Sequence, residues 1–156
     1  MVLVLPEAVV VELSIGLGIA LNLILTEVCG FASAGLVVPG YLALYLDQPG
    51  RMLATWVVAL CTWASIRYGL ARLIVLYGRR RFGVTVLTGF LLNAVFLSTL
   101  QRLPPEPLDL RAVGYIVPGL IANTALAQGV WPTVVCTFLV AASVRLLLLL
   151  IVGWAG

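Results

Sequence analysis

Long apolar stretches alternate with short, interrupted ones along this chain. A transmembrane helix needs about 20 consecutive apolar residues, and four stretches approach or exceed that length: Ala8–Thr26, Met52–Tyr77, Gly83–Gln101 and Val130–Trp154. Two shorter segments, Ala32–Leu46 and Ala112–Ala127, each contain a Pro-Gly pair. Because proline lacks a backbone donor and glycine is a poor helix former, we expect the backbone to open at these pairs. The pattern predicts an all-α integral membrane protein.

The two interrupted segments resemble each other. Residues Glu27–Gly40 read EVCGFASAGLVVPG, and residues Glu106–Gly119 read EPLDLRAVGYIVPG. The identities, which recur without a gap, are Glu27/Glu106, Gly35/Gly114, Val38/Val117, Pro39/Pro118 and Gly40/Gly119. This repeat predicts a duplicated unit of long helix, broken segment and long helix within one membrane domain, covering about residues 7–77 and 83–156. Duplicated membrane folds often place their site where such breaks meet.

Two paths through the membrane stay open. If both broken segments are re-entrant, the chain crosses four times and its halves have the same orientation; the shortness of the segments favours this arrangement. If both segments cross, there are six crossings and the halves are inverted, as in many transporters. Residues 78–82 contain Arg79, Arg80 and Arg81. Short arginine-rich loops stay cytoplasmic, so we expect this loop inside the cell.

Composition agrees with a membrane location. The chain is 63% hydrophobic and 10% charged, whereas soluble proteins are about half apolar and a quarter charged. Its net charge of +3 comes from arginine without any lysine, but no basic stripe with interleaved aromatic residues indicates nucleic-acid binding. Histidine is absent and the three cysteines are scattered. With no nucleophile–base set, Walker loop or zinc spacing either, we predict no catalytic residue, cofactor or metal site in this chain.

Arginines inside the apolar stretches are candidates for anion binding. Arg67 and Arg145 lie within predicted long helices, and Ser65-Ile66-Arg67 is similar to Ser143-Val144-Arg145. An arginine near mid-membrane is costly, so it normally faces a partner or a wet path. We therefore expect Arg67 and Arg145 to face the protein interior and to bind an anion.

Acids and amides at matching positions are further candidates. Glu27 and Glu106 precede the two breaks. Either they form a symmetric pair that binds a cation or amine, or each caps the short helix that follows. Asn93 lies in the middle of a predicted helix and is expected to hydrogen-bond to a neighbouring helix. Asn123 stands where the first copy has Leu44, which would give a central site one polar and one apolar wall.

Several motifs resemble one known family. They are Thr26-Glu27, GLVVPGYLAL (Gly35–Leu44), Gln48-Pro49, YGRRRF (Tyr77–Phe82), RAVGYIVPGLIANT (Arg111–Thr124) and Gln128-Gly129. In this order they closely resemble the small membrane subunit of bacterial poly-γ-glutamate synthases, the PgsC/CapC type. The family has a basic residue directly after the acid, where this chain has Val28. Arg67 is also unusual for the family.

The resemblance implies a non-catalytic subunit of the bacterial cell membrane. Its partner would be an ATP-dependent amide ligase, related to the Mur ligases, that joins glutamates through their γ-carboxylates. The ligase would bring the ATP and metal, and a surface-exposed subunit would export or anchor the polymer. Whether one chain or several, as a homo-oligomer, would enclose a path stays open.

Our hypothesis from the sequence has two parts. Arg79–Arg81 docks the ligase or receives the polyanion, and the broken segments, with Arg67, Arg111 and Arg145, line or flank its exit route. Two alternatives stay open: a pure assembly scaffold, and an independent transporter of small anions.

Overall fold

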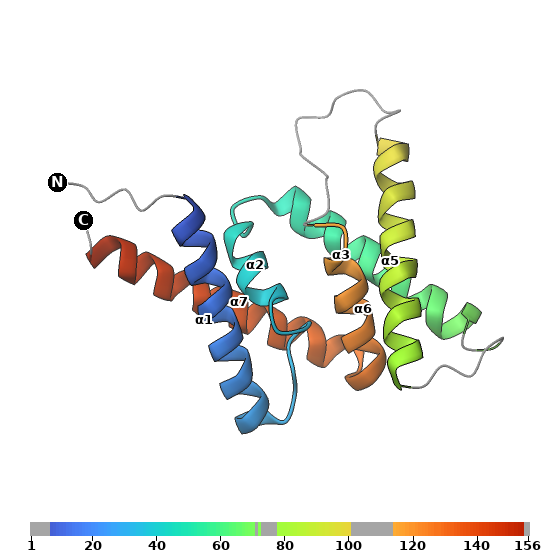
Figure 1. Cartoon of the computed structure of the whole chain (residues 1–156), viewed down its shortest axis with the longest axis horizontal. Helices are drawn as coiled ribbons and strands as arrows, with labels where there is room; N and C mark the ends of the chain where they lie inside the picture. Colours follow the sequence, from blue (N-terminus) through green and yellow to red (C-terminus); the bar gives the residue numbers. More distant parts are fainter. Residues whose placement is uncertain (1–6, 71, 73–77, 101–113, 155–156) are drawn as a thin grey trace.

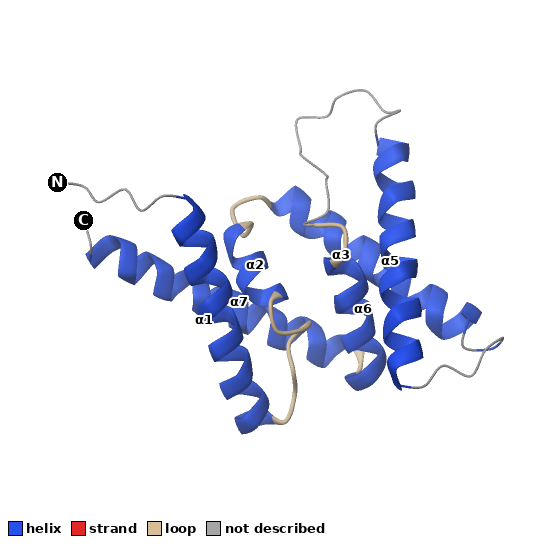
Figure 2. Cartoon of the chain, viewed as in Figure 1, coloured by secondary structure: helices blue, strands red, loops and turns tan. Residues whose placement is uncertain are grey.

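The computed structural model describes residues 7–70, 72, 78–100 and 114–154. Within these ranges all regular structure is helical (Figures 1 and 2). The elements are α1 (Glu7–Cys29), α2 (Val38–Leu44), α3 (Pro49–Ala64), the π-helix η1 (Ser65–Leu70), α5 (Gly78–Leu100), α6 (Val117–Gln128) and α7 (Val130–Trp154). We refer to residues 7–70 as the first half and to residues 78–154 as the second half.

Four helical segments are long and apolar enough to cross a membrane. They are Ala8–Cys29, Pro49–Leu70, Gly78–Leu100 and Val130–Ile151. The four predicted stretches are thus confirmed as long apolar helices over their described parts; residues 71, 73–77 and 101 of these stretches lie outside the described residues. One boundary was wrong: residues 78–82 form the first turn of α5 and not a loop. Arginine is a good helix former, so three consecutive arginines extend the helix at this position.

The breaks lie before the Pro-Gly pairs, which differs from our expectation. The non-helical residues are 30–37 in the first half and 114–116 in the described part of the second. Pro39 and Pro118 then lie in the first turns of α2 and α6. Proline is tolerated there because the first N–H groups of a helix have no intrahelical acceptor and its φ suits the helix. Gly35 and Gly114 have φ of 101° and 70°, a conformation that favours glycine.

Each short helix packs back against the long helix that precedes it, with glycine at the contact. A Cβ built on Gly18 of α1 would lie 2.6 Å from the Cα of Gly40 in α2. A Cβ built on Gly89 of α5 would lie 2.6 Å from the Cα of Gly119 in α6. Figure 1 shows that α1 and α5 point in opposite directions and that α2 and α6 run back along them.

The remaining long helices join the two halves. α3 packs against α5 and α6 of the second half, and α7 packs against α1 and α2 of the first. In Figure 1 they also run in opposite directions, and α7 ends on the side of the molecule where α1 begins. The core is a set of small and aliphatic side chains, largely from α2, α3 and α7: Ala34, Val38, Leu42, Ala43, Met52, Ala59, Ile121, Val140, Ala141, Val144 and Leu148.

Candidate functional site

Three polar side chains hold the non-helical segment that precedes α2. Asn22 of α1 accepts a hydrogen bond from the Ser33 N–H (2.9 Å) and donates a longer one to the Gly35 carbonyl (3.5 Å). Gln128 accepts from the Ala32 N–H (3.1 Å) and donates to the carbonyl of the same residue. The hydroxyl of Thr137 in α7 accepts from the Ala34 N–H (3.0 Å). We call Asn22, Gln128 and Thr137 the polar clamp.

The polar clamp supplies hydrogen-bond partners that the unwound backbone needs. Ser33 and Ala34 are fully buried, so water cannot satisfy their peptide groups. Inside a bilayer, non-helical backbone is tolerated only where protein or a wet cavity covers it. Helices α1, α6 and α7 each supply one side chain for this purpose. The segment is therefore positioned by residues from both halves of the chain.

A similar contact occurs in the second half. Asn93 of α5 is buried and donates a hydrogen bond to the Gly114 carbonyl at 3.3 Å. Asn93 was predicted to hydrogen-bond to a neighbouring helix, but its acceptor lies in the non-helical residues just before α6. Asn22 follows Gly18, and Asn93 follows Gly89, at the same spacing in the sequence. Sequence reasoning missed this match, although a polar residue one turn after a glycine in two apolar helices was a readable signal.

The two membrane arginines have different surroundings. Arg145 forms an ion pair with Asp47, which lies in the turn between α2 and α3. Arg67 lies in η1 with its guanidinium 5.5 Å from the ring centre of Trp63. Arg145 is 31% exposed, whereas Arg67 is exposed on the surface of the chain. The expectation of an interior position is therefore wrong for Arg67, whose charge rests on an aromatic face.

Tyr68 completes an aromatic group beside Arg67. Its ring meets that of Trp63 edge to face, with centres 6.1 Å apart. Cation–π attraction stabilises an arginine over an indole without using its N–H donors. Within the described residues no carboxylate pairs with Arg67. Among those residues, its donors therefore have no anionic partner.

The other predicted residues do not converge on one centre. Arg79 and Arg80 are exposed at the start of α5, and Arg81 is partly buried. Glu27 is exposed in the last turn of α1, and the residue that caps α2 is Val37, without a side-chain hydrogen bond. The capping interpretation is therefore wrong for Glu27. Glu106 and Arg111 lie outside the described residues.

Asn123 is half-buried in α6, and its amide oxygen accepts no hydrogen bond from any described residue. Among the residues that the structure describes, no three histidine, cysteine, aspartate or glutamate side chains gather as metal ligands.

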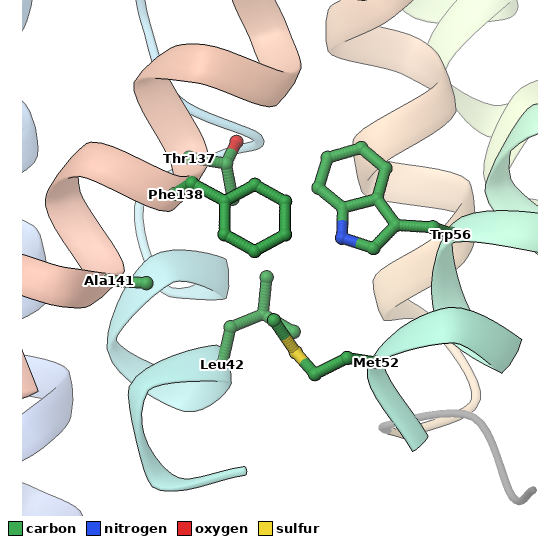
Figure 3. Close-up of a pocket in the computed structure, with 6 residues that line it drawn as sticks. All are labelled: Leu42, Met52, Trp56, Thr137, Phe138 and Ala141. Atoms are coloured by element: carbon green, nitrogen blue, oxygen red, sulfur yellow. The ribbon is translucent and has the colours of Figure 1, made fainter. Parts of the chain in front are cut away.

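A small apolar pocket lies between α2, α3 and α7 (Figure 3). Its lining residues are Leu42, Met52, Trp56, Thr137, Phe138 and Ala141. The rings of Trp56 and Phe138 stack with centres 5.6 Å apart and planes inclined by 12°. The space is too small for a water molecule. A single chain therefore has no open channel at this place.

Helices of this number, length and apolarity define a class, that of multi-pass membrane proteins. The family model for capsule biosynthesis CapC matches residues 17–134. The chain is 45% identical over 125 residues to the capsule biosynthesis protein CapC of Bacillus anthracis, and 43% identical over 125 residues to the PGA biosynthesis protein CapC of Bacillus subtilis (strain 168). Each match covers 80% of this chain and 84% of the relative.

The chain therefore belongs to the CapC/PgsC family of capsule (poly-γ-glutamate) biosynthesis proteins, and the resemblance read from its motifs is confirmed. No solved structure matches it. The matched region includes both glycine contacts and two of the three clamp residues, whereas Thr137 and Arg145 lie beyond it.

Proposed function

We propose that this chain is the membrane subunit of a poly-γ-glutamate synthase and export complex. It holds an ATP-dependent glutamate ligase at the membrane and guides the polyanion across. The observation that carries this proposal is the pair of broken segments, whose short helices α2 and α6 each pack back on a long helix through a glycine contact, in a chain of the CapC family. The ligase supplies ATP and metal, and a surface-exposed subunit receives the polymer.

The two halves are proposed to be inverted copies of one unit. Matching contacts support this: Gly18 with Gly40 and Gly89 with Gly119. The asparagines act alike in both halves, because each donates to the carbonyl of a positive-φ glycine. The opposite directions of α1 and α5 in Figure 1 agree with inversion. Inverted repeats are a common plan of transporters, whose sites lie where broken helices meet.

This geometry favours six crossings over four. In the first broken segment, Ser33 hydrogen-bonds to Asn22 of α1, and Gly40, further along the segment, packs against Ser14 of α1. The segment therefore runs back along most of α1. A re-entrant segment would leave the membrane on the side where it entered. With six crossings the α2–α3 turn and the start of α5 lie on opposite sides of the membrane. The positive-inside rule then puts Arg79–Arg81 in the cytoplasm and Asp47 outside.

The polymer path follows from this sidedness. The exposed guanidinium groups of Arg79 and Arg80 dock the ligase or receive its polyanionic product. Arg67 lies toward the cytoplasmic end of its span and Arg145 toward the outer end of α7. Because the space between α2, α3 and α7 is closed, the path runs along the surface of the chain, against a second copy or a partner subunit.

Inverted membrane vesicles test the proposal. Vesicles with the ligase, and with or without this chain, receive ATP and labelled glutamate, and polymer inside them is separated from polymer outside. The conduit role requires that polymer accumulates inside only when the chain is present. Synthesis that depends on the chain while no polymer enters would favour a scaffold. Unchanged yield and location would contradict both roles and favour an independent anion transporter.

A further inference from the structure

The ion pair between Arg145 and Asp47 links parts of the chain that are far apart in sequence. Arg145 belongs to α7, and Asp47 belongs to the turn between α2 and α3. Arg145 lies about 9 Å from the end of its span at Ile151, from a rise of about 1.5 Å per residue. Side-chain exposure is 31% for Arg145 and 69% for Asp47. The pair is therefore open to exchange with ions from outside.

Arg67 lies in the similar Ser-Ile-Arg stretch of the first half, one residue out of register with the repeat, and has no such partner among the described residues. Trp63 supports its charge through a ring face, and the guanidinium donors stay available. One arginine of the matched pair is thus free and the other is internally neutralised. Under the proposed sidedness the free arginine is nearer the cytoplasm and the neutralised one is nearer the outside.

We propose that the Asp47 carboxylate substitutes for a polymer carboxylate at Arg145 and competes with the polymer for that guanidinium. This inference rests on the conduit part of the proposed function. Each γ-linked glutamate unit carries a free carboxylate, the same group that Asp47 presents. An arginine fork binds either one through the same paired N–H donors. Exchange replaces one ion pair with another, so Arg145 is never left unpaired.

Competition at this end of the path favours release. Conduction needs binding that is favourable enough for capture and weak enough for departure. A free Arg67 suits capture from the cytoplasm. At Arg145 each departing carboxylate is replaced by Asp47, which closes the site behind the polymer. The partial exposure of the pair suits this role, because exposed ion pairs are weak and are readily exchanged.

The test measures binding of a fluorescent γ-linked glutamate decamer to the purified chain in lipid nanodiscs. Asp47→Asn removes the competitor, and we expect the affinity to rise about 1.5- to 5-fold, the range that corresponds to an exposed pair. In the Arg145→Gln background the same substitution should change nothing, because the shared guanidinium is gone. Glu12→Gln is the matched control, since it removes another exposed carboxylate near the same membrane face.

Several results would overturn the proposal. They are an unchanged or lower affinity in Asp47→Asn, an equal rise in Glu12→Gln, a rise that persists without Arg145, and no detectable binding by any variant. If Asp47→Asn is not recovered from the membrane, Asp47→Ser takes its place. Failure of the proposed function looks different: Arg67→Leu and Arg145→Leu would then both leave polymer accumulation in the vesicles normal.

Discussion

Adding one methyl group at Gly40 should separate α1 from α2. In Gly40→Ala the new Cβ would lie 2.9 Å from the Cα of Ile15 and closer still to the carbonyl oxygen of Ser14. Carbon atoms pack at about 3.5–4.0 Å, and both neighbours are backbone atoms that cannot rotate away. The helices must therefore move apart by about 1 Å. Overpacking of this kind destabilises by about 1–3 kcal/mol.

The gain in helix propensity offsets part of this loss. Alanine is better than glycine inside a helix by about 1 kcal/mol, so we expect a net destabilisation of up to about 2 kcal/mol for Gly40→Ala. Gly119→Ala should be milder, because its nearest contact is the Cα of Val86 at 2.9 Å and the carbonyl oxygens are farther away. Gly16→Ala is the control, since a Cβ there would meet nothing within 4 Å.

Thermal unfolding in detergent, followed by tryptophan fluorescence, measures all three variants. We predict a melting temperature lowest for Gly40→Ala, intermediate for Gly119→Ala, and equal to or above that of the parent chain for Gly16→Ala. If Gly40→Ala and Gly16→Ala have the same melting temperature, α1 and α2 do not approach each other as described. The reasoning on paired glycine contacts would then be refuted.

Two further predictions concern the polar clamp and the start of α5. Thr137→Val keeps the shape of the side chain but removes the acceptor of the buried Ala34 N–H. The free energy of unfolding should therefore fall by about 1–3 kcal/mol. Thr62→Val removes a hydroxyl that donates to the Val58 carbonyl of its own helix, and it should cost about 1 kcal/mol or less in the same melting assay; equal losses would speak against the clamp. Replacing Arg79 and Arg80 together by glutamine should reduce co-purification of the ligase with the membrane subunit severalfold, because each exposed ion pair contributes up to about 1 kcal/mol. Unchanged co-purification would exclude this docking site.

The long helices were predictable because their signal is local. About 20 apolar residues in a row have few alternatives to a transmembrane helix, and α7 begins and ends where its pattern predicts. The place of the breaks was less predictable. Proline stops a helix that reaches it but suits the first turn of a new one. Pro39 and Pro118 therefore mark where helices begin, and the unwound residues precede them.

The contacts between the halves were beyond sequence reasoning. Gln128 and Thr137 bind backbone groups about one hundred residues earlier in the chain, and no local pattern indicates which segment a buried amide will meet. The same holds for Arg145, whose partner among the six acids depends on how α7 crosses α2. Arg67 was misjudged because its nearest stabilising group is an aromatic ring and not a charge.

Sidedness follows from the proposed inversion and connects the fold to the function. An inverted pair of halves places one free arginine and one neutralised arginine toward opposite membrane faces. A polyanion that enters beside the arginines of α5 would then leave beside Asp47. With re-entrant segments, by contrast, both ends of each broken segment would lie on one face. The number of crossings therefore decides between these two descriptions of the path.

Labelling of the native thiol of Cys29 tests the number of membrane crossings most directly. Cys29 is exposed at the end of α1, and replacing Cys61 and Cys136 by alanine leaves it as the only thiol. We predict that a membrane-impermeant maleimide labels Cys29 in inverted vesicles and not in whole cells, as it should label Arg79→Cys in a chain without Cys29. Gln48→Cys, in the same background, should react from outside the cell. Labelling of Cys29 from outside, together with Gln48→Cys, would contradict six crossings and the inverted arrangement of the halves.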